Sequence, residues 1–256
     1  MNYKDQIKRI VSMYEVPYIF TNESLTDFIS VQGSLQYCWG FCARNVSDKD
    51  LSTVSNEVLF NIPFNSETVY GPTNFPYAQI FEQMKTPGLS IRELYQKGID
   101  GSGINIAVID KPILKLHSEF TDCLAEYTLI SEKERGNDFH FHGMTCASFA
   151  CGKTTGTAPG AKLYYYAYPD DFTDDDMYWN YHFKAFKMII EHNKSQVDKI
   201  SIVSVSAGVP YTNQAILNKL FAFVDDMAKG GCYLIFSNNF GSTFTCSSRV
   251  YGADID

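Results

Sequence analysis

An alternation of short apolar runs with longer helix-like segments, beginning after residue 100, most constrains the fold. The apolar runs are continuous, which is typical of strands that are buried on both faces of a sheet. Strands are predicted at residues 104–109, 163–168, 200–205 and 233–236, and helices at residues 142–151, 177–193 and 213–229. This order predicts an α/β fold with three layers, α/β/α, in which helices cover both faces of a mainly parallel sheet.

Length and charge narrow the class of protein. The chain has 256 residues, 45% of them hydrophobic, which suits one globular domain with an appendage. The formal net charge of −8 argues against a nucleic-acid partner. No stretch of the sequence approaches the ~20 consecutive apolar residues that a membrane helix requires. We therefore expect no membrane partner.

The cysteines and the N-terminus predict the compartment. The seven cysteines are an odd number, so they cannot all pair within the chain. The first residues, Met1 to Gln6, are polar, and no apolar signal core follows them. We therefore expect reduced thiols and a cytoplasmic location.

A stretch rich in turn-forming residues suggests a domain boundary. Residues 65–76 contain Gly71, Pro72 and Pro76 together with several Asn and Ser residues. We therefore divide the chain into residues 1–76, an N-terminal extension, and residues 77–256, the main domain. Two short helices are predicted at the start of that domain, at residues 77–84 and 89–97.

Two side chains suited to acid–base chemistry follow predicted elements of the sheet. Asp110 ends the first strand, and His142 opens the next helix. Ser206 and the pair Asn238-Asn239 lie at the ends of two later strands, and ligands bind at such ends in parallel sheets. An aspartate and a histidine are two parts of a system that activates a nucleophile. The alternatives are a turn residue for Asp110 and a helix-capping histidine for His142.

The glycines near the first strand do not form a dinucleotide-binding motif. Such a motif places its glycines after the strand, whereas Gly101 and Gly103 precede it. The acidic run at residues 170–176 could hold a structural calcium ion, but it lacks the spacing of a hand-type loop. We interpret it as a solvated loop that also caps the following helix.

Other candidate ligands do not form a complete metal site. His140 and His142 are two residues apart, and Cys38 and Cys42 are four apart, but neither pair has a matching second half nearby. We therefore predict no metal and no cofactor. Cys146 lies one helical turn after His142, which predicts a thiol behind the imidazole and makes it a poor nucleophile.

Five segments, in one order, resemble motifs of the subtilisin family of serine peptidases. They are Gly103–Asp110, His142–Ser148, Gly156–Leu163, Val205–Gly208 and Leu234–Gly241. The resemblance covers about residues 85 to 256. It implies the subtilisin-like α/β/α fold, hydrolysis of peptide bonds through an Asp/His/Ser triad, and a peptide or protein substrate. It also allows residues 1–76 to be a pro-segment-like region.

The resemblance also implies a role for each matching residue. His142 would be the general base, and Asp110 would fix its tautomer. Asn239, chosen over Asn238 because Gly241 follows at the family's offset, would donate its amide to the oxyanion. Backbone groups would pair with an extended substrate at the small residues Ser206, Ala207 and Gly208.

The sequence lacks the motif that carries the nucleophilic serine in the family. No Gly-Thr-Ser turn is present, and Asp256 follows Asn239 by only seventeen residues. We therefore expect the serine outside this chain, through truncation or processing, with a companion C-terminal fragment as one source. This chain alone is then expected to be inactive. The alternative is a non-catalytic subtilisin-like pseudoprotease that binds peptides or regulates a partner. Pro112, Thr145 and Asn238, which differ from the family's usual residues, support this alternative.

Overall fold

The computed structural model describes residues 82, 85, 88–131, 139–169, 171–208 and 212–237, with only the backbone of Phe141. The chain divides into two units, one of residues 1–88 and 246–256 and the other of residues 89–245. All helices and strands discussed below belong to the second unit. The predictions for residues 1–76 and for Asn239 lie outside the described residues.

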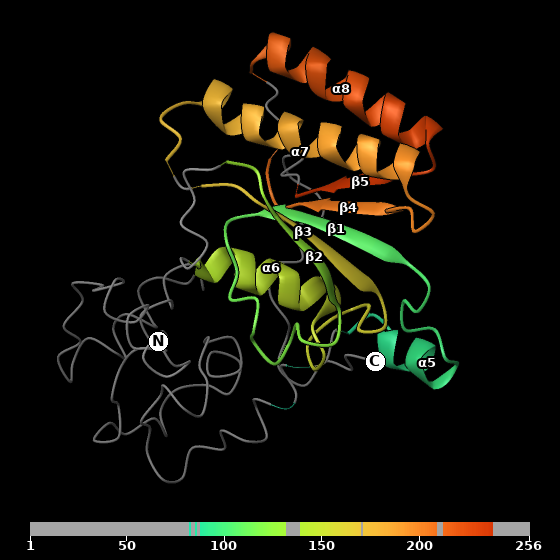
Figure 1. The fold of residues 1–256 in the computed structure, drawn as a ribbon. Helices are drawn as coiled ribbons and strands as arrows, with labels where there is room; N and C mark the ends of the chain where they lie inside the picture. Colours follow the sequence, from blue (N-terminus) through green and yellow to red (C-terminus); the bar gives the residue numbers. More distant parts are fainter. Residues whose placement is uncertain are drawn as a thin grey trace, which may run out of the picture. The chain divides into compact units, whose positions relative to one another are not determined.

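A five-stranded sheet forms the centre of this unit (Figure 1). Its order is β2-β3-β1-β4-β5, and every pair of neighbouring strands is parallel. The strands are β1 (Asn105–Asp110), β2 (Leu124–Leu129), β3 (Lys162–Ala167), β4 (Ile202–Val205) and β5 (Tyr233–Phe236). Because all strands run in one direction, their carboxyl ends meet at one edge of the sheet.

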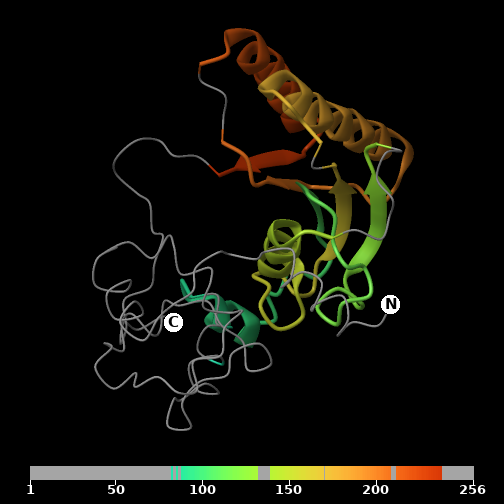
Figure 2. The same cartoon turned by 90° about the vertical axis from the view of Figure 1, so that its left-hand side faces the viewer.

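Helices cover the two faces of this sheet. Helices α7 (Asp175–Ser195) and α8 (Gln214–Lys229) lie over one face, and α6 (Phe141–Cys151) lies on the other (Figures 1 and 2). A short helix, α5 (Ile91–Gln96), precedes β1. The predicted α/β/α architecture with a mainly parallel sheet is therefore confirmed.

Burial explains why the first strand occupies the centre. All six residues of β1 are buried, and its side chains alternate between two hydrophobic cores. Ile106 and Val108 belong to the core that contains residues of α6, whereas Ala107 and Ile109 belong to the core under α7 and α8. Asp110 has the same parity as Val108, which directs its side chain to the α6 side.

Strand β2 is the one element of the described sheet that the sequence did not predict. It pairs with β3 at the edge of the sheet, and none of its six residues is buried. Its sequence includes Glu126 and Thr128, so it shows no continuous apolar run. The criterion that identified the interior strands therefore could not detect it.

Polar side chains cap the starts of α7 and α8. The side chain of Asp174 accepts a hydrogen bond from the backbone N–H of Met177 at 2.8 Å, and Asn213 does the same for Ile216 at 3.2 Å. Asp175 and Asp176 lie in the first turn of α7, where the helix dipole favours negative charge. The predicted capping role of this acidic run is confirmed.

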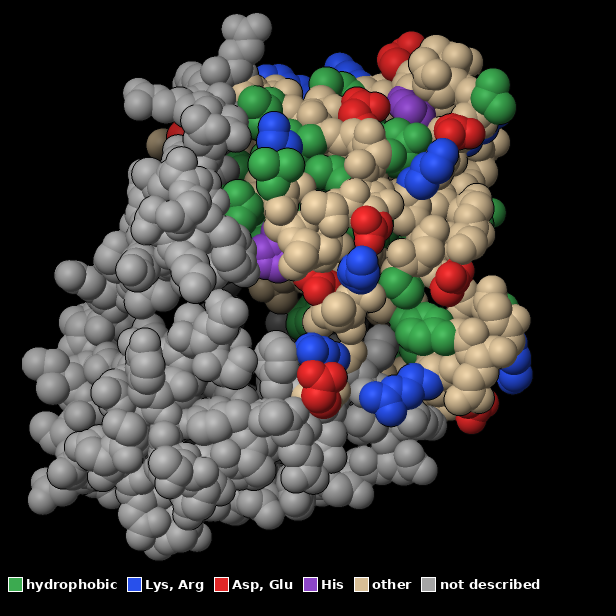
Figure 3. Space-filling model, turned by 60° about the horizontal axis from the view of Figure 1, so that its bottom comes forward, with side chains coloured by type: hydrophobic (Ala, Val, Ile, Leu, Met, Phe, Trp, Pro, Cys, Tyr) green, Lys and Arg blue, Asp and Glu red, His purple; other side chains and the backbone are tan. Residues whose placement is uncertain are grey.

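Charged side chains of both signs are scattered over one face of the described residues. On the face shown in Figure 3, acidic and basic side chains of the described residues lie interspersed. Two exposed ion pairs, Lys153–Asp122 at 2.7 Å and Lys162–Asp198 at 2.9 Å, contribute little to stability because water screens them. None of the described helices combines the length and apolar character needed to cross a membrane.

A buried histidine lies in the aromatic core under α7. His182 is 1% exposed and packs against the rings of Tyr168, Tyr178 and Trp179. Its Nδ1 lies 3.0 Å from the carbonyl oxygen of Tyr178, so Nδ1 carries the proton and donates it. Nε2 is buried, and no described residue forms a hydrogen bond with it. Burial lowers the pKa of His182 from 6.5 to about 4, which keeps the ring neutral.

Because His182 is buried in its neutral form, we predict that the protein becomes less stable in acid. The unfolded chain binds a proton near pH 6.5 and the folded protein only near pH 4, so the free energy of unfolding falls as the pH decreases across this window. Urea unfolding should show wild type losing up to roughly 3 kcal/mol more than His182→Gln between these values. Groups that titrate in both proteins cancel in this comparison. Parallel pH profiles for the two proteins would contradict the assignment of a neutral His182.

Candidate active site

The structure brings Asp110 and His142 together, although they are far apart in the sequence. Asp110 is the last residue of the central strand, and its side chain is 1% exposed. His142 lies in the first turn of α6 and has a side chain that is 41% exposed. Nδ1 of His142 lies 2.8 Å from Oδ1 of Asp110. The imidazole is thus held on one side by a buried carboxylate while the ring remains accessible.

The Asp110 carboxylate is fixed by its own strand end. Its Oδ1 also accepts a hydrogen bond from the backbone N–H of Lys111 at 2.7 Å. The other oxygen, Oδ2, is buried and has no hydrogen-bond partner among the residues that the structure describes. Asp110 is therefore more than a turn residue, because one of its two oxygens binds the histidine.

The start of α6 distinguishes the roles of two histidines. The backbone N–H of His142 donates to Nδ1 of His140 at 3.1 Å, so His140 is the residue that caps the helix. The side chain of His142 therefore does not cap the helix, so the alternative of a helix-capping His142 is wrong. The ring of His142 instead turns to Asp110.

Gly143 allows the helix to approach the end of β1 closely. A Cβ atom at this position would overlap the carbonyl oxygen of Lys111 and lie 2.5 Å from the Tyr165 hydroxyl oxygen. That hydroxyl donates a hydrogen bond to the Lys111 carbonyl at 2.5 Å. The glycine after His142 is thus required by packing, and this close approach positions the imidazole beside Asp110.

The electrostatic environment favours the charged form of His142. The hydrogen bond with Asp110, followed by the contact with Cys146, raises the pKa of His142 from 6.5 to about 10, although burial opposes the shift. Stabilisation of an imidazolium by a carboxylate is what a general base requires as it takes up a proton.

Cys146 contacts the imidazole from the side that Asp110 occupies. Its Sγ lies 3.8 Å from Nδ1 of His142, the same nitrogen that faces Asp110. A nucleophile would need to face Nε2. The prediction that the thiol sits behind the imidazole agrees with this contact, and a catalytic cysteine at this position is incompatible with it.

Ser206, at the end of β4, lies next to Cys146 and thus near the Asp110–His142 pair. Its hydroxyl donates a hydrogen bond to Sγ of Cys146 at 3.0 Å. Ala207 is buried and Gly208 is exposed. The structure therefore places the predicted substrate-binding segment near the Asp110–His142 pair, while its pairing with a substrate stays a prediction.

One residue of this site, Tyr165, and one contact, between Ser206 and Cys146, were not identified from the sequence. Tyr165 positions the Lys111 carbonyl, and the contact from Ser206 positions Cys146. The alternation of buried side chains along β3 places Tyr165 on the α6 side, which is the one sequence signal that could have identified it. The contact between Ser206 and Cys146 had no such signal.

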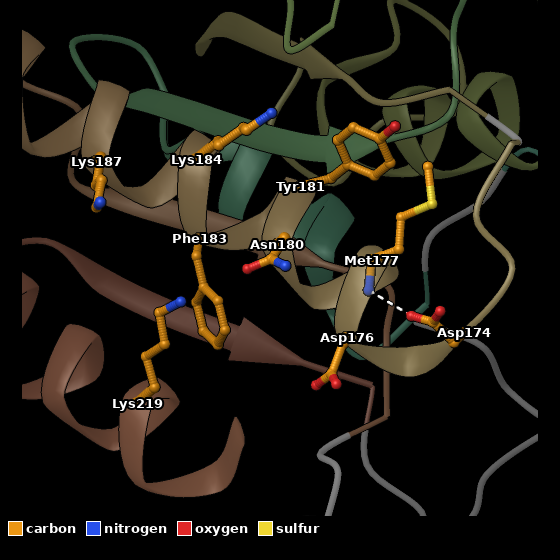
Figure 4. A pocket seen from close by; sticks show the side chains of 9 residues that line it. All are labelled: Asp174, Asp176, Met177, Asn180, Tyr181, Phe183, Lys184, Lys187 and Lys219. Atoms are coloured by element: carbon orange, nitrogen blue, oxygen red, sulfur yellow. Dashed lines mark hydrogen bonds between the residues drawn. The ribbon is translucent and has the colours of Figure 1, made fainter. Parts of the chain in front are cut away.

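A separate cavity lies on α7 and α8 (Figure 4). It has a volume of about 610 Å³. Its lining residues are Asp174, Asp176, Met177, Asn180, Tyr181, Phe183, Lys184, Lys187 and Lys219. Lys219 lies over the ring of Phe183, with its Nζ 4.2 Å from the ring centre. The lining includes neither Asp110 nor His142, so we assign the cavity no part in the candidate chemistry.

A comparison with protein families agrees with this geometry. Residues 101–247, more than half of the chain, match the subtilase family, peptidase S8. The chain belongs to the subtilase family. A comparison with curated proteins finds no match.

Three similar solved structures are all proteases. The prenylagaramide maturation protease PagA has 18% identity, a TM-score of 0.41, and coverage of 58% of this chain and 50% of its own. The epidermin leader peptide processing serine protease EpiP from Staphylococcus aureus is 14% identical in sequence, with a TM-score of 0.44. The match covers 59% of this chain and 41% of EpiP. A lanthipeptide protease is 11% identical in sequence, with a TM-score of 0.46. The match covers 62% of this chain and 46% of that protease. The chain thus spans at most about half the length of these structures.

The packing at Gly143 predicts that Gly143→Ala destabilises the protein. The added methyl group must displace the Lys111 carbonyl or the Tyr165 ring, which should cost about 1–3 kcal/mol in the free energy of unfolding. Phe149→Leu, at an exposed position of the same helix, is the matched control and should change stability by less than about 0.5 kcal/mol. Equal urea midpoints for Gly143→Ala and wild type would contradict the close approach of α6 to β1.

Proposed function

We propose that this chain forms part of a subtilisin-like serine endopeptidase that hydrolyses peptide bonds in peptides or proteins. The observation that supports this proposal most is the hydrogen bond between the buried Asp110 carboxylate and Nδ1 of His142. The bond occurs in a member of the subtilase family and at the carboxyl edge of a parallel sheet, where sites in such folds form.

In the proposed mechanism His142 acts first as base and then as acid. Asp110 holds the imidazole with the proton on Nδ1, which leaves the Nε2 lone pair for a serine hydroxyl. Nε2 takes the serine proton as the oxygen attacks the scissile carbonyl, and later gives it to the leaving amine. Water then hydrolyses the acyl-enzyme by the same sequence of steps. Asp110 stabilises the imidazolium that forms between these steps.

Two further parts of the site remain predictions. Ser206 to Gly208 would pair through their backbone with an extended substrate, and their small side chains permit close approach. Asn239 would donate its amide to the oxyanion. The contact of Ser206 with Cys146 supports the first of these, because it places the end of β4 beside the imidazole.

We propose that the nucleophile is a serine outside these 256 residues, since the sequence contains no Gly-Thr-Ser turn. A longer gene product or a companion fragment could supply it. The position of Cys146 at Nδ1 supports this proposal, because the cysteine cannot replace the serine. The second candidate function, a non-catalytic subtilisin-like protein, is favoured by the same missing turn.

A reducing compartment such as the cytoplasm remains our proposal for the location. Cys123, Cys146, Cys151 and Cys232, the cysteines that the structure describes, all carry free thiols. Free thiols support such a compartment, because disulfides form in oxidising ones.

A fluorophosphonate probe tests the proposed peptidase, because it captures an activated serine. The native protein from its source should be labelled, and His142→Ala should slow labelling at least about 100-fold through loss of the base. Labelling should become faster as the pH rises above 7. The raised pKa of His142 means that the neutral imidazole, which acts as the base, forms only at higher pH.

The matched control is His192→Ala, on α7, which should label at the wild-type rate. Unchanged labelling of His142→Ala would contradict the assigned base. Absence of labelling in the wild type, even after limited proteolysis to remove an inhibitory N-terminus, would favour the non-catalytic candidate.

A further inference from the structure

We propose that the cavity on α7 and α8 binds a short peptide of three or four residues through its charged amino and carboxyl ends. The cavity has a volume of about 610 Å³, within the range of pockets that hold small ligands. Most of its lining comes from α7 and the cap of that helix, and Lys219 comes from α8. Neither Asp110 nor His142 lines it, so the binding itself does not depend on the proposed peptidase.

The charges along this cavity are separated by sign. Asp176 lies in the first turn of α7, and Lys187 lies about three turns later in the same helix. The ammonium of Lys219 lies over the ring of Phe183, which places a second positive charge toward the Lys187 end. In Figure 4 the acidic side chains lie toward one side of the drawn group and those of Lys187 and Lys219 toward the other. A ligand with a positive charge at one end and a negative charge at the other therefore matches this lining.

Among the described residues, the charged side chains at the two ends have no ion-pair partner. Five lysines elsewhere in this part of the chain form ion pairs with carboxylates. No ion pair between described residues engages Lys187, Lys219 or Asp176. A ligand carboxylate or ammonium could therefore bind at either end without first breaking an existing pair.

An aromatic and amide surface lies between the charged ends. Phe183 is 4% exposed, and its ring stacks on that of Phe223 with the ring centres 5.4 Å apart. The cation–π contact at 4.2 Å holds the Lys219 ammonium beside this ring. Met177 and the exposed amide of Asn180 also line the cavity. The ring and the thioether suit an apolar side chain, and the amide can both donate to and accept from a peptide backbone.

The spacing of the charges sets the length of the peptide. Phe183, under the Lys219 ammonium, follows Asp176 by seven residues of α7, which is about 10 Å along the helix axis. Lys187 follows Asp176 by eleven residues, or about 16 Å. An extended peptide of three residues spans about 10 Å and one of four residues about 14 Å. A tripeptide or tetrapeptide can therefore place its ammonium at Asp176 and its carboxylate between Lys219 and Lys187.

This arrangement selects short peptides with unmodified ends. A longer chain cannot bring its amino and carboxyl ends to both charged ends of the cavity while it lies extended, and an internal segment of a protein has neither charge on its backbone. Hydrolysis of peptide bonds releases short peptides of this kind. The cavity would then hold products of the reaction, and this link alone rests on the proposed function.

Titration of the full chain with the tetrapeptide Ala-Phe-Ala-Ala tests the site, with saturation-transfer NMR of the peptide as the readout. The peptide with both ends unmodified should bind in the millimolar range or tighter at neutral pH and low salt. Acetylation of its amine or amidation of its carboxylate should each weaken binding roughly five- to tenfold, because each removes one charge-assisted hydrogen bond.

Two variants assign the two ends of the cavity. Lys187→Gln/Lys219→Gln should bind the unmodified and the amidated peptide equally, because the partners of the carboxylate are gone. Asp176→Asn should bind the unmodified and the acetylated peptide equally for the same reason at the other end. All three side chains are exposed, so these changes should leave the fold intact.

Matched controls carry the same changes in charge outside the cavity. Lys194→Gln/Lys229→Gln alters lysines of α7 and α8 that have their own ion pairs, and Asp225→Asn alters an exposed carboxylate of α8. Both controls should respond to each blocking group as wild type does.

Three results would overturn the proposal. They are failure of the unmodified peptide to bind, equal binding of the unmodified and the doubly blocked peptide by wild type, and loss of the response to blocking in the controls. Because the readout is binding to exposed side chains of α7 and α8, none of these results bears on the fluorophosphonate test of the peptidase.

Discussion

The hydrogen bond between the Asp110 carboxylate and the His142 imidazole is the interaction on which the candidate site depends. It joins the end of the central strand to the first turn of α6, with Oδ1 and Nδ1 2.8 Å apart. A carboxylate at 1% exposure is unfavourable unless it is paired. The bond therefore compensates for the burial of Asp110, while it fixes the ring and raises the pKa of His142.

The surrounding packing explains how this bond is held. Gly143 lets α6 approach the Lys111 carbonyl, which the Tyr165 hydroxyl holds from the sheet side. His140 satisfies the helix start, so His142 is not needed as a cap. The same nitrogen, Nδ1, faces both Asp110 and Cys146, which leaves Nε2 for a nucleophile.

The sequence predicted the interior of the fold better than its edge. Strands buried on both faces, such as β1, have continuous apolar runs, whereas β2 lies at an edge with polar residues among its six and was missed. The pairing of Asp110 with His142 came from the order of the family motifs, because spacing alone cannot show contacts between elements. The contact of Cys146 with Ser206 depends on helix rotation and strand register, which no local pattern indicates.

The central claim is that Nε2 of His142 serves a serine nucleophile while Asp110 holds Nδ1. A crystal structure of the complete native protein after reaction with a fluorophosphonate tests it most directly. We predict the phosphonylated oxygen on a serine within about 3 Å of Nε2, with the Asp110–His142 bond intact. A phosphonyl group on any residue remote from His142 would contradict the account.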